Sequence, residues 1–286
     1  MFDLFADDPR AQSILSHAGA LLGQDIPTLL QTADDATLFA NRTSQILCVA
    51  RGLAAACLAP TSPFTAAGYS VGEMAAWGVA GIWSPERTLD LTAHRAEAMD
   101  SASGPDDALG FVRGLPQDRV EALVARFDCH IAIVNPALLF VIGGRRDDVE
   151  RCCTSALGEG AASARPIAVY IASHTPRLSS AVAPFRAALE ASAPGRPARG
   201  RTLIGATTAS IVSGARDLSG LANQIDTTID WAATLEALLE RGVDRILELG
   251  PGTALADMVR AVDPALDIRA VDDFRSVAGI RDWMSR

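Results

Sequence analysis

The chain has 286 residues, of which 49% are hydrophobic and 21% charged, and its 25 Lys+Arg against 34 Asp+Glu give a formal net charge of 25 − 34 = −9. This apolar content excludes intrinsic disorder, and no collagen or coiled-coil period is present. The negative charge argues against a nucleic-acid-binding protein, which needs a basic face to neutralise phosphates.

Nothing in the sequence predicts export or membrane insertion. Aspartates at 3, 7 and 8 leave no basic segment ahead of an apolar stretch, so no signal peptide is expected. The longest apolar run, 131–142, is interrupted by Asn135-Pro136 and is too short to cross a bilayer. The five cysteines have no metal-ligand spacing, and their odd number suits a reducing compartment. We therefore expect a cytoplasmic protein with no metal site.

Helical patterns dominate the first hundred residues. Asp8-Pro9 is a good pair of N-cap and first helical residue, and an apolar face over about 43–58 predicts a second helix. The apolar stretch 64–69 predicts a strand that runs directly into a helix starting at Val71. Ser84-Pro85 starts another helix. The strand-to-helix junction carries a serine and is the first place to look for chemistry.

From about residue 108 the pattern changes to short strands alternating with helices. Strands are predicted at 109–112, 131–134, 138–142 and 166–169, with helices at 116–127 and 147–157. This β-α-β-β-α-β order over about 60 residues is typical of a ferredoxin-like unit. We interpret it as a small domain inserted within a larger one.

After residue 173 strands and helices alternate again. Helices are predicted at 176–189, 231–240 and about 254–259, and strands at 202–204 and 245–249. The alternation predicts an α/β core with a mostly parallel sheet. The expected division is a large α/β subdomain in two parts, 1–107 and 171–286, around a small subdomain at 108–170.

The junction sequence Gly68-Tyr69-Ser70-Val71-Gly72 fits the G-x-S-x-G nucleophile elbow. Glycines on both sides allow a strained turn that lifts the serine hydroxyl clear of the backbone, and the helix N-terminus beneath it offers N–H groups to an oxyanion. The bare pattern is common, and such turns also serve structure alone. The apolar strand before it and the amphipathic helix after it favour Ser70 as a nucleophile.

A serine nucleophile needs a base, and the chain has four histidines. His17 and His94 lie within predicted helices, and His130 begins an apolar strand, so solvated or packing roles are the default for these three. His174 stands just past a strand end, where α/β folds place functional groups. We select His174, with a packing role as the alternative.

No acid stands out between Ser70 and His174, so a Ser–His dyad oriented by a backbone carbonyl is preferred to a triad. Such a dyad activates water less well, which a transferase tolerates. Arg95, on an otherwise apolar helix face, needs a partner, and its guanidinium matches a carboxylate. A structural ion pair is the favoured explanation from this position alone, and a carboxylate on the substrate is the alternative.

Together these residues resemble the malonyl-CoA:acyl carrier protein transacylase family over nearly the whole chain. Five blocks in the family's order carry the resemblance: Asn41, Thr43 and Gln45 in a polar turn; Gly68–Glu73 with Ala80-Gly81; Leu91, Arg95 and Met99; Ser173–Pro176; and Glu248–Gly252. The resemblance implies an α/β-hydrolase-like large subdomain with a parallel sheet and an inserted ferredoxin-like small subdomain.

The resemblance also implies a role for each matched residue. Ser70 would be acylated, and His174 would act as base and then as acid. The backbone carbonyl of Gln224 would orient the histidine. The remaining implied contacts are substrate-binding ones: Arg95 to the malonyl carboxylate, the Val71 N–H to the oxyanion, and Tyr69 and Asn135 as lining of the site.

The implied reaction is a ping-pong transfer of a malonyl group from coenzyme A to the phosphopantetheine thiol of an acyl carrier protein, in fatty acid or polyketide biosynthesis. No bound cofactor is implied, and we expect a monomer. Because the carrier would be acidic, the enzyme needs a local basic patch. Candidates for it are Arg145, Arg146 and Arg177; the alternative is that these arginines belong to an ordinary solvated surface.

The chain departs from the family's pattern in several places. It begins just after the position of the family's first strand and its Gly-Gln-Gly loop, which gives the second oxyanion donor. Two explanations stay open: Met1 is an internal methionine of a longer chain, or this piece is missing. Tyr69 replaces the usual histidine, and Ile133 and Leu139 make one wall of the site drier. Ser173 stands where malonyl-selective polyketide transferases have phenylalanine, so methylmalonyl remains an alternative acyl group.

The C-terminal segment 271–283 resembles the malonate decarboxylase epsilon subunit, a relative that loads malonyl onto a dedicated carrier. Two rival functions stay open at this stage. A serine esterase or thioesterase would have no need of Arg95, and a non-catalytic scaffold would bind a partner without acylation of Ser70.

Overall fold

Helices form most of the first hundred residues, as the sequence predicts. The computed structural model describes residues 2–5, 7–58 and 63–285, and it begins with a short 3-10 turn, Asp3–Phe5. The helices that follow are α1 (Pro9–Leu22), α2 (Ile26–Thr32), α3 (Asp35–Phe39), α4 (Asn41–Ala56), α5 (Gly72–Val79) and α6 (Pro85–Ala102). The expected caps are formed: the carboxylate of Asp8 accepts the Arg10 amide at 2.9 Å, and the hydroxyl of Ser84 accepts the Arg87 amide at 3.2 Å.

Parallel strands form the centre of the larger part of the molecule. β1 (Phe64–Ala67) pairs in parallel with β6 (Arg201–Gly205), and β7 (Ser210–Ile211) adds to β6 in the antiparallel sense. A second parallel pair consists of β9 (Arg245–Glu248) and β10 (Asp267–Ala270). The expected α/β fold is confirmed, although the described strands form two small sheets here and not one continuous parallel sheet.

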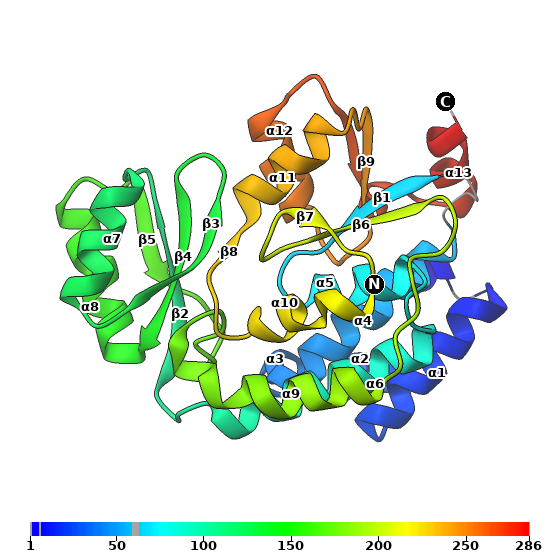
Figure 1. Cartoon of the computed structure of the whole chain (residues 1–286), viewed down its shortest axis with the longest axis horizontal. Coiled ribbons are helices and arrows are strands. Elements are labelled where there is room, and N and C mark those ends of the chain that lie inside the picture. The colour runs from blue at the N-terminus through cyan, green and yellow to red at the C-terminus, as the bar shows by residue number, and fades with distance from the viewer. Residues whose placement is uncertain (1, 6, 59–62, 286) are drawn as a thin grey trace.

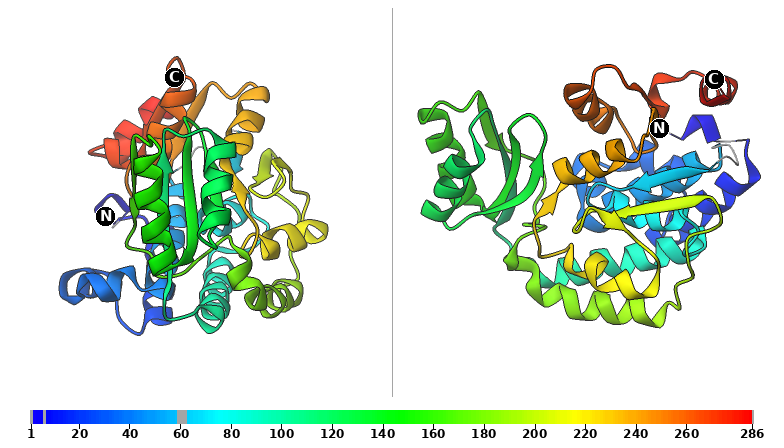
Figure 2. Two further views of the ribbon diagram at one scale, coloured as in Figure 1. Left: turned by 90° about the vertical axis from the view of Figure 1, so that its left-hand side faces the viewer. Right: turned by 45° about the horizontal axis from the view of Figure 1, so that its top comes forward.

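The helices that follow residue 178 surround these strands, as Figure 1 shows. They are α9 (Ser179–Ala191), α10 (Leu218–Asn223), α11 (Trp231–Glu240), α12 (Ala254–Val262) and α13 (Val277–Ser285), with 3-10 turns at Pro176–Leu178, Ala215–Asp217 and Val271–Asp273. Helices α6 and α9 lie side by side below the central strands, and α11 and α12 lie above them (Figures 1 and 2).

A separate mixed sheet stands to one side of the molecule (Figure 1), and two helices cover its outer face, which turns toward the viewer in the left panel of Figure 2. Its strand order is β5-β2-β4-β3-β8, with β2 at Asp107–Arg113, β3 at His130–Asn135, β4 at Leu139–Arg145, β5 at Ser163–Pro166 and β8 at Ile229–Asp230. Helices α7 (Gln117–Arg126) and α8 (Arg146–Gly158) complete the β-α-β-β-α-β order that the sequence predicts. The division of the chain at 107/108 and 170/171 stays a proposal.

The predicted strand 166–169 is displaced by three residues. The strand is Ser163–Pro166, antiparallel to β2, and it ends where Pro166 supplies no N–H to continue the ladder. Beyond the proline, the amide of Ile167 still reaches the Leu109 carbonyl at 3.0 Å. The sequence patterns do not predict α2, α3, α10, α13 or the short strands β7, β8 and β10. These elements are short, and their burial depends on distant neighbours.

Three apolar clusters hold these elements together. The largest joins α1, α4, α5, α6 and α9, and a second lies between the outer helices and the small sheet. The third contains Ile133 of the small sheet together with Ile204 and Trp231 of the larger part. Both faces of the small sheet are therefore covered, and its inner face is fixed against the central strands.

Asp107 ties the start of the small sheet to the segment that follows His174. Its carboxylate is 1% exposed, and it accepts the Arg177 Nε at 2.6 Å and the Gly104 amide at 2.9 Å. Asp106 beside it is exposed and lies 3.6 Å from Arg145. A buried carboxylate with charge-assisted hydrogen bonds contributes to stability, and an exposed ion pair contributes little.

We expect Asp107→Ala to lower the free energy of unfolding by about 2 kcal/mol, since it leaves Arg177 and the Gly104 amide without their acceptor. Asp106→Ala is the matched control and should change it by no more than about 0.5 kcal/mol. Urea unfolding of both variants measures the difference. Equal effects of the two substitutions would contradict this account.

Candidate active site

The turn between β1 and α5 has the strained geometry of a nucleophile elbow. Ser70 has φ 51°, in the left-handed region that side chains rarely adopt. A Cβ on Gly68 would lie 2.2 Å from the backbone nitrogen of Glu73, so only glycine allows the strand to approach the helix this closely. The sequence therefore forces the serine onto the tip of the turn, at the carboxyl end of a central strand.

His174 lies against Ser70 as the base that the sequence analysis selected. The Ser70 hydroxyl and the His174 Nε2 are 2.7 Å apart, and the His174 Nδ1 is 2.5 Å from the Gln224 carbonyl oxygen. A carbonyl can only accept, so Nδ1 carries the proton and Nε2 offers its lone pair to the serine. The structure thus brings together all three residues expected to be catalytic, although they come from distant parts of the chain.

The environment of His174 keeps its ring neutral. Burial lowers the pKa of His174 to about 3, and the nearby positive charge of Arg95 acts in the same direction, while the hydrogen bond to Gln224 opposes both. The residue also has φ 61°, a second strained backbone at the site. A neutral imidazole is the form that can accept the serine proton.

Arg95 is 1% exposed and lies at the same site. Its Nη1 donates to the Gln45 Oε1 at 2.6 Å, and its Nη2 donates to the Gln224 Oε1 at 2.9 Å. Its Nε has no hydrogen-bond partner in the described part of the chain. Burial lowers the pKa of Arg95 to about 10, so the guanidinium keeps its charge at neutral pH. Both of these partners are neutral amides, so the structural ion pair favoured by the sequence alone is absent from these contacts.

The amide of Val71 is placed to serve as an oxyanion donor. Val71 is the residue before α5, and the next three amides donate to the carbonyls of residues 69, 70 and 71 at 2.8–3.0 Å. The Val71 amide itself makes no backbone hydrogen bond among the described residues. A free N–H at a helix N-terminus next to the nucleophile favours negative charge on a bound oxygen.

Tyr69 and Asn135, the two residues expected to line the site, lie beside each other. The Tyr69 ring packs edge-on against Trp231, with ring centroids 5.3 Å apart, and burial raises the pKa of Tyr69 to about 12. Asn135 is 3% exposed and lies beside the Tyr69 hydroxyl, but neither its amide nitrogen nor its oxygen makes a well-formed hydrogen bond within the described residues. Buried polar atoms without a hydrogen-bond partner are rare in folded proteins, and a bound water or ligand would account for these two.

The three arginines considered for a basic patch have different surroundings. Arg177 is held by the buried Asp107, and Arg145 lies near Asp106. Arg146 lies over the exposed ring of Tyr170, 5.3 Å from its centroid, in the segment that leads to His174. Of the three, Arg146 is the one with no ion pair in the described part of the structure.

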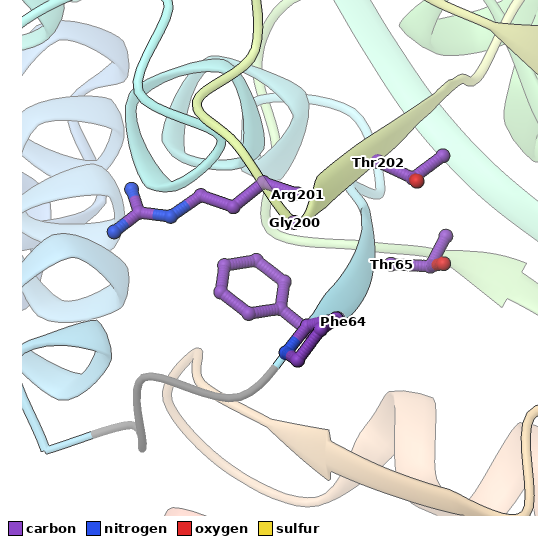
Figure 3. A pocket seen from close by; sticks show the side chains of 6 residues that line it. Phe64, Thr65, Gly200, Arg201 and Thr202 are labelled. Atoms are coloured by element: carbon purple, nitrogen blue, oxygen red, sulfur yellow. The ribbon is translucent and has the colours of Figure 1, made fainter.

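A hollow of about 330 Å³ lies at the opposite end of the central strands. It is lined by Pro63, Phe64, Thr65, Gly200, Arg201 and Thr202, where β1 and β6 begin (Figure 3). Ligands of open α/β sheets bind at the carboxyl ends of the strands. This hollow lies at the amino ends and contains none of the reactive groups described above.

Three side chains of the site have no individual role among the predictions made from the sequence. Gln45 contacts Arg95, Glu73 contacts Gln224, and Trp231 packs on Tyr69. Gln45 and Glu73 both belong to the matched motifs. Gln45 is also a polar residue on the apolar face of a predicted helix, and this position is a signal that could have identified it. Trp231 carried no signal, because its neighbour Tyr69 is 162 positions away in the sequence.

Comparisons with known proteins agree with this geometry. The family model described as acyl transferase domain matches residues 47–268. The polyketide biosynthesis protein ThaF of Burkholderia thailandensis is 32% identical over 209 residues, which cover 71% of this chain but only 18% of that relative. The malonyl CoA-acyl carrier protein transacylase of Staphylococcus aureus is 22% identical, with coverage of 97% of this chain and 92% of that protein.

A solved structure has the same fold over the whole chain. The acyl-carrier-protein S-malonyltransferase of Burkholderia pseudomallei 1710b superposes with a TM-score of 0.88 and 25% identity, covering 100% of this chain and 94% of that one. No helix among the described residues is both long and apolar enough to cross a bilayer.

We expect the His174 ring to remain neutral, with its proton on Nδ1, from pH 8 down to pH 5. Its lowered pKa means that it binds a second proton only at far more acidic pH, whereas an ordinary histidine is protonated near pH 6.5. Long-range ¹H–¹⁵N spectra of the four histidine rings measure this, and His174→Gln assigns the signal by its loss. A His174 signal that titrates between pH 6 and 7 would contradict the proposed burial of the base.

Proposed function

The chain belongs to the acyl transferase domain family, and we propose that it is a malonyl transferase that acts between coenzyme A and the phosphopantetheine thiol of an acyl carrier protein. The names of the relatives in Staphylococcus aureus and Burkholderia pseudomallei support this choice of substrates. The chain spans only 18% of ThaF, which is a much larger protein.

One arrangement carries the proposal. Gln224 accepts the His174 Nδ1 proton at its backbone oxygen and the Arg95 Nη2 at its side-chain oxygen. A single residue therefore holds both the base that activates the nucleophile and the cation that can bind a carboxylate. An esterase for neutral acyl groups has no use for a buried guanidinium at this position, whose desolvation is costly.

In the first half-reaction, Ser70 Oγ attacks the carbonyl carbon of the malonyl thioester and its proton passes to the His174 Nε2. The carbonyl oxygen takes the negative charge next to the Val71 N–H. The carbon–sulfur bond then breaks, and coenzyme A leaves as a thiol with the proton returned by His174. The product is a malonyl ester on Ser70.

In the second half-reaction, the carrier thiol gives its proton to His174 and attacks the ester carbonyl. Ser70 leaves with the proton from His174, and the malonyl group is now a thioester on the carrier. The imidazolium formed on the way is oriented by a neutral carbonyl and not by a carboxylate. Water is therefore activated weakly, and the acyl-enzyme survives until the thiol arrives.

Arg95 would bind the malonyl carboxylate and so select carboxylated acyl groups. A guanidinium fork forms two charge-assisted hydrogen bonds with a carboxylate. Ser173 is 8% exposed beside His174, and this small residue leaves methylmalonyl as an alternative acyl group. The likeness of the C-terminal segment to the malonate decarboxylase epsilon subunit stays a prediction.

We further propose a cytoplasmic location, a monomeric state and docking of the carrier near Arg146. The free state of all five cysteines suits a reducing compartment. The docking proposal follows from the position of Arg146 over Tyr170, in the segment that leads to His174.

We expect a brief incubation with malonyl-CoA to add one malonyl group to the wild-type chain and none to Ser70→Ala, as measured by intact mass. Arg95→Ala should lower the rate of malonyl addition about 100-fold, because two charge-assisted hydrogen bonds are lost. Acetyl-CoA should react slowly with the wild type, and its rate should change little in Arg95→Ala.

Arg216→Ala is the control, since this arginine is 80% exposed and lies outside the site. Hydrolysis of malonyl-CoA without accumulation of the adduct would assign the chain to the esterases. If the chain forms no adduct and does not hydrolyse malonyl-CoA, it is a non-catalytic scaffold.

A further inference from the structure

Glu73 is a buried carboxyl that no step of the proposed reaction uses. It is 2% exposed, near the start of α5. One carboxylate oxygen accepts the Ala206 amide at 3.2 Å, and the other accepts the side-chain Nε2 of Gln224. Burial raises the pKa of Glu73 to about 7, against these hydrogen bonds and the charge of Arg95. Burying a carboxyl in this way is costly, so its contacts need an explanation.

The hydrogen-bond partners on either side of Gln224 fix the direction of its amide. The Gln224 nitrogen donates to a carboxylate oxygen of Glu73 and to the Ser70 carbonyl at 3.1 Å, and a carbonyl oxygen can only accept. The Gln224 oxygen then faces Arg95, which only donates. Reversing this amide would place an NH₂ group against the guanidinium.

A second relay leaves Arg95 on its other side. The Gln45 Oε1 accepts from Arg95, and the Gln45 Nε2 donates to the Asn41 Oδ1 at 2.6 Å. The Asn41 Nδ2 in turn donates to the Asp100 Oδ1 at 3.0 Å. Every donor therefore points outward from the guanidinium, and each relay ends on a carboxylate.

This arrangement fixes the orientation of the Arg95 guanidinium, and no carboxylate of the described residues is in direct contact with it. Glu73 and Asp100 each stand at least one amide away from the guanidinium, and the Arg95 Nε has no partner among the described residues. A carboxylate in direct contact would take the fork that an acyl carboxylate needs.

The dyad has additional supports that do not involve Glu73. The His174 amide donates to the Ile225 carbonyl at 2.7 Å, and the Gln224 amide donates to the Gly220 carbonyl at 3.0 Å. The backbone oxygen that orients His174 is thus held by α10 and the turn after it. The side chain of Gln224, which reaches Arg95, is held by Glu73.

We propose that Glu73 is a positioning residue for acyl selection: through the side-chain amide of Gln224 it holds Arg95 in the orientation that recognises a carboxylated acyl group. The proposal rests on the proposed function. It separates two properties of one site, since Glu73 governs which acyl group reacts, whereas the reactivity of Ser70 toward an uncharged reagent depends on the dyad alone.

Glu73→Gln keeps the shape of the side chain but introduces an NH₂ group. The new NH₂ group is a donor and must face another donor, either the Ala206 amide or the Gln224 nitrogen. If it faces the Gln224 nitrogen, the Gln224 amide turns over and its nitrogen then faces Arg95. Glu73→Asp keeps an acceptor-only carboxylate on a shorter stem, so it should preserve the amide direction.

The test compares single-turnover acylation of the full chain by malonyl-CoA and by acetyl-CoA, followed by quenched intact mass. We expect Glu73→Gln to lower the ratio of malonyl to acetyl rates about tenfold, mainly through the malonyl rate, because a hydrogen bond to a charged group is misdirected. Glu73→Asp should lie closer to the wild type. Labelling of Ser70 by an uncharged fluorophosphonate should stay within about threefold in both variants.

A double-mutant cycle tests whether the effect passes through the Gln224 side chain. Gln224→Ala keeps the backbone carbonyl and should lower the malonyl-to-acetyl ratio by itself. In that background Glu73→Gln should change the ratio less than twofold. Glu248→Gln is the matched control, because Glu248 is also a buried carboxylate, 8% exposed, that accepts backbone amides (Leu255 at 3.2 Å and Ala256 at 2.8 Å), and it should leave the ratio unchanged.

Three outcomes would overturn the proposal: an unchanged ratio in Glu73→Gln, an equal loss of malonyl, acetyl and fluorophosphonate reactions, or independent effects of the two substitutions in the cycle. The equal loss would assign Glu73 a role in stability alone. If the wild type forms no malonyl adduct on Ser70, the proposed function fails first, and that result is distinct from all three.

Discussion

The site depends on a full positive charge buried in the protein interior. Arg95 is held by two amide side chains and not by a carboxylate in direct contact, so its charge is balanced at a distance. An unpaired buried charge is costly, and the amides reduce this cost by directing their dipoles at the guanidinium. The same charge helps to keep His174 neutral, and a bound carboxylate would offset it.

The fold brings these groups together from elements that are distant in the sequence. Ser70 follows the carboxyl end of β1, Arg95 lies on α6, and Gln224 follows the short helix α10. Strained backbones at Ser70 and His174 persist because the surrounding contacts over-determine them. The small sheet closes the remaining side with Asn135, and its inner face is fixed by the same apolar cluster that holds Trp231.

The C-terminal segment contributes mainly to the architecture. Asp272 pairs with the buried Arg51 and accepts the Gly252 amide at 2.7 Å, and the indole of Trp283 donates to the Asp267 carboxylate at 2.9 Å. Ile280 and Trp283 are buried. In this structure, residues of the segment 271–283 therefore stabilise the packing of the C-terminal part. This role is separate from the resemblance of the segment to a decarboxylase subunit.

Local spacing, caps and periodicity are enough to predict the strand-to-helix elbow at Ser70, the long helices and the order of the small sheet. The sequence also indicates His174 and Arg95 as candidate site residues. Tertiary contacts, by contrast, bring both residues to Gln224, place Glu73 against its side-chain amide and pair the central strands. Those facts are contacts between residues up to 151 positions apart, and the direction of a hydrogen bond between them leaves no periodic trace in the sequence.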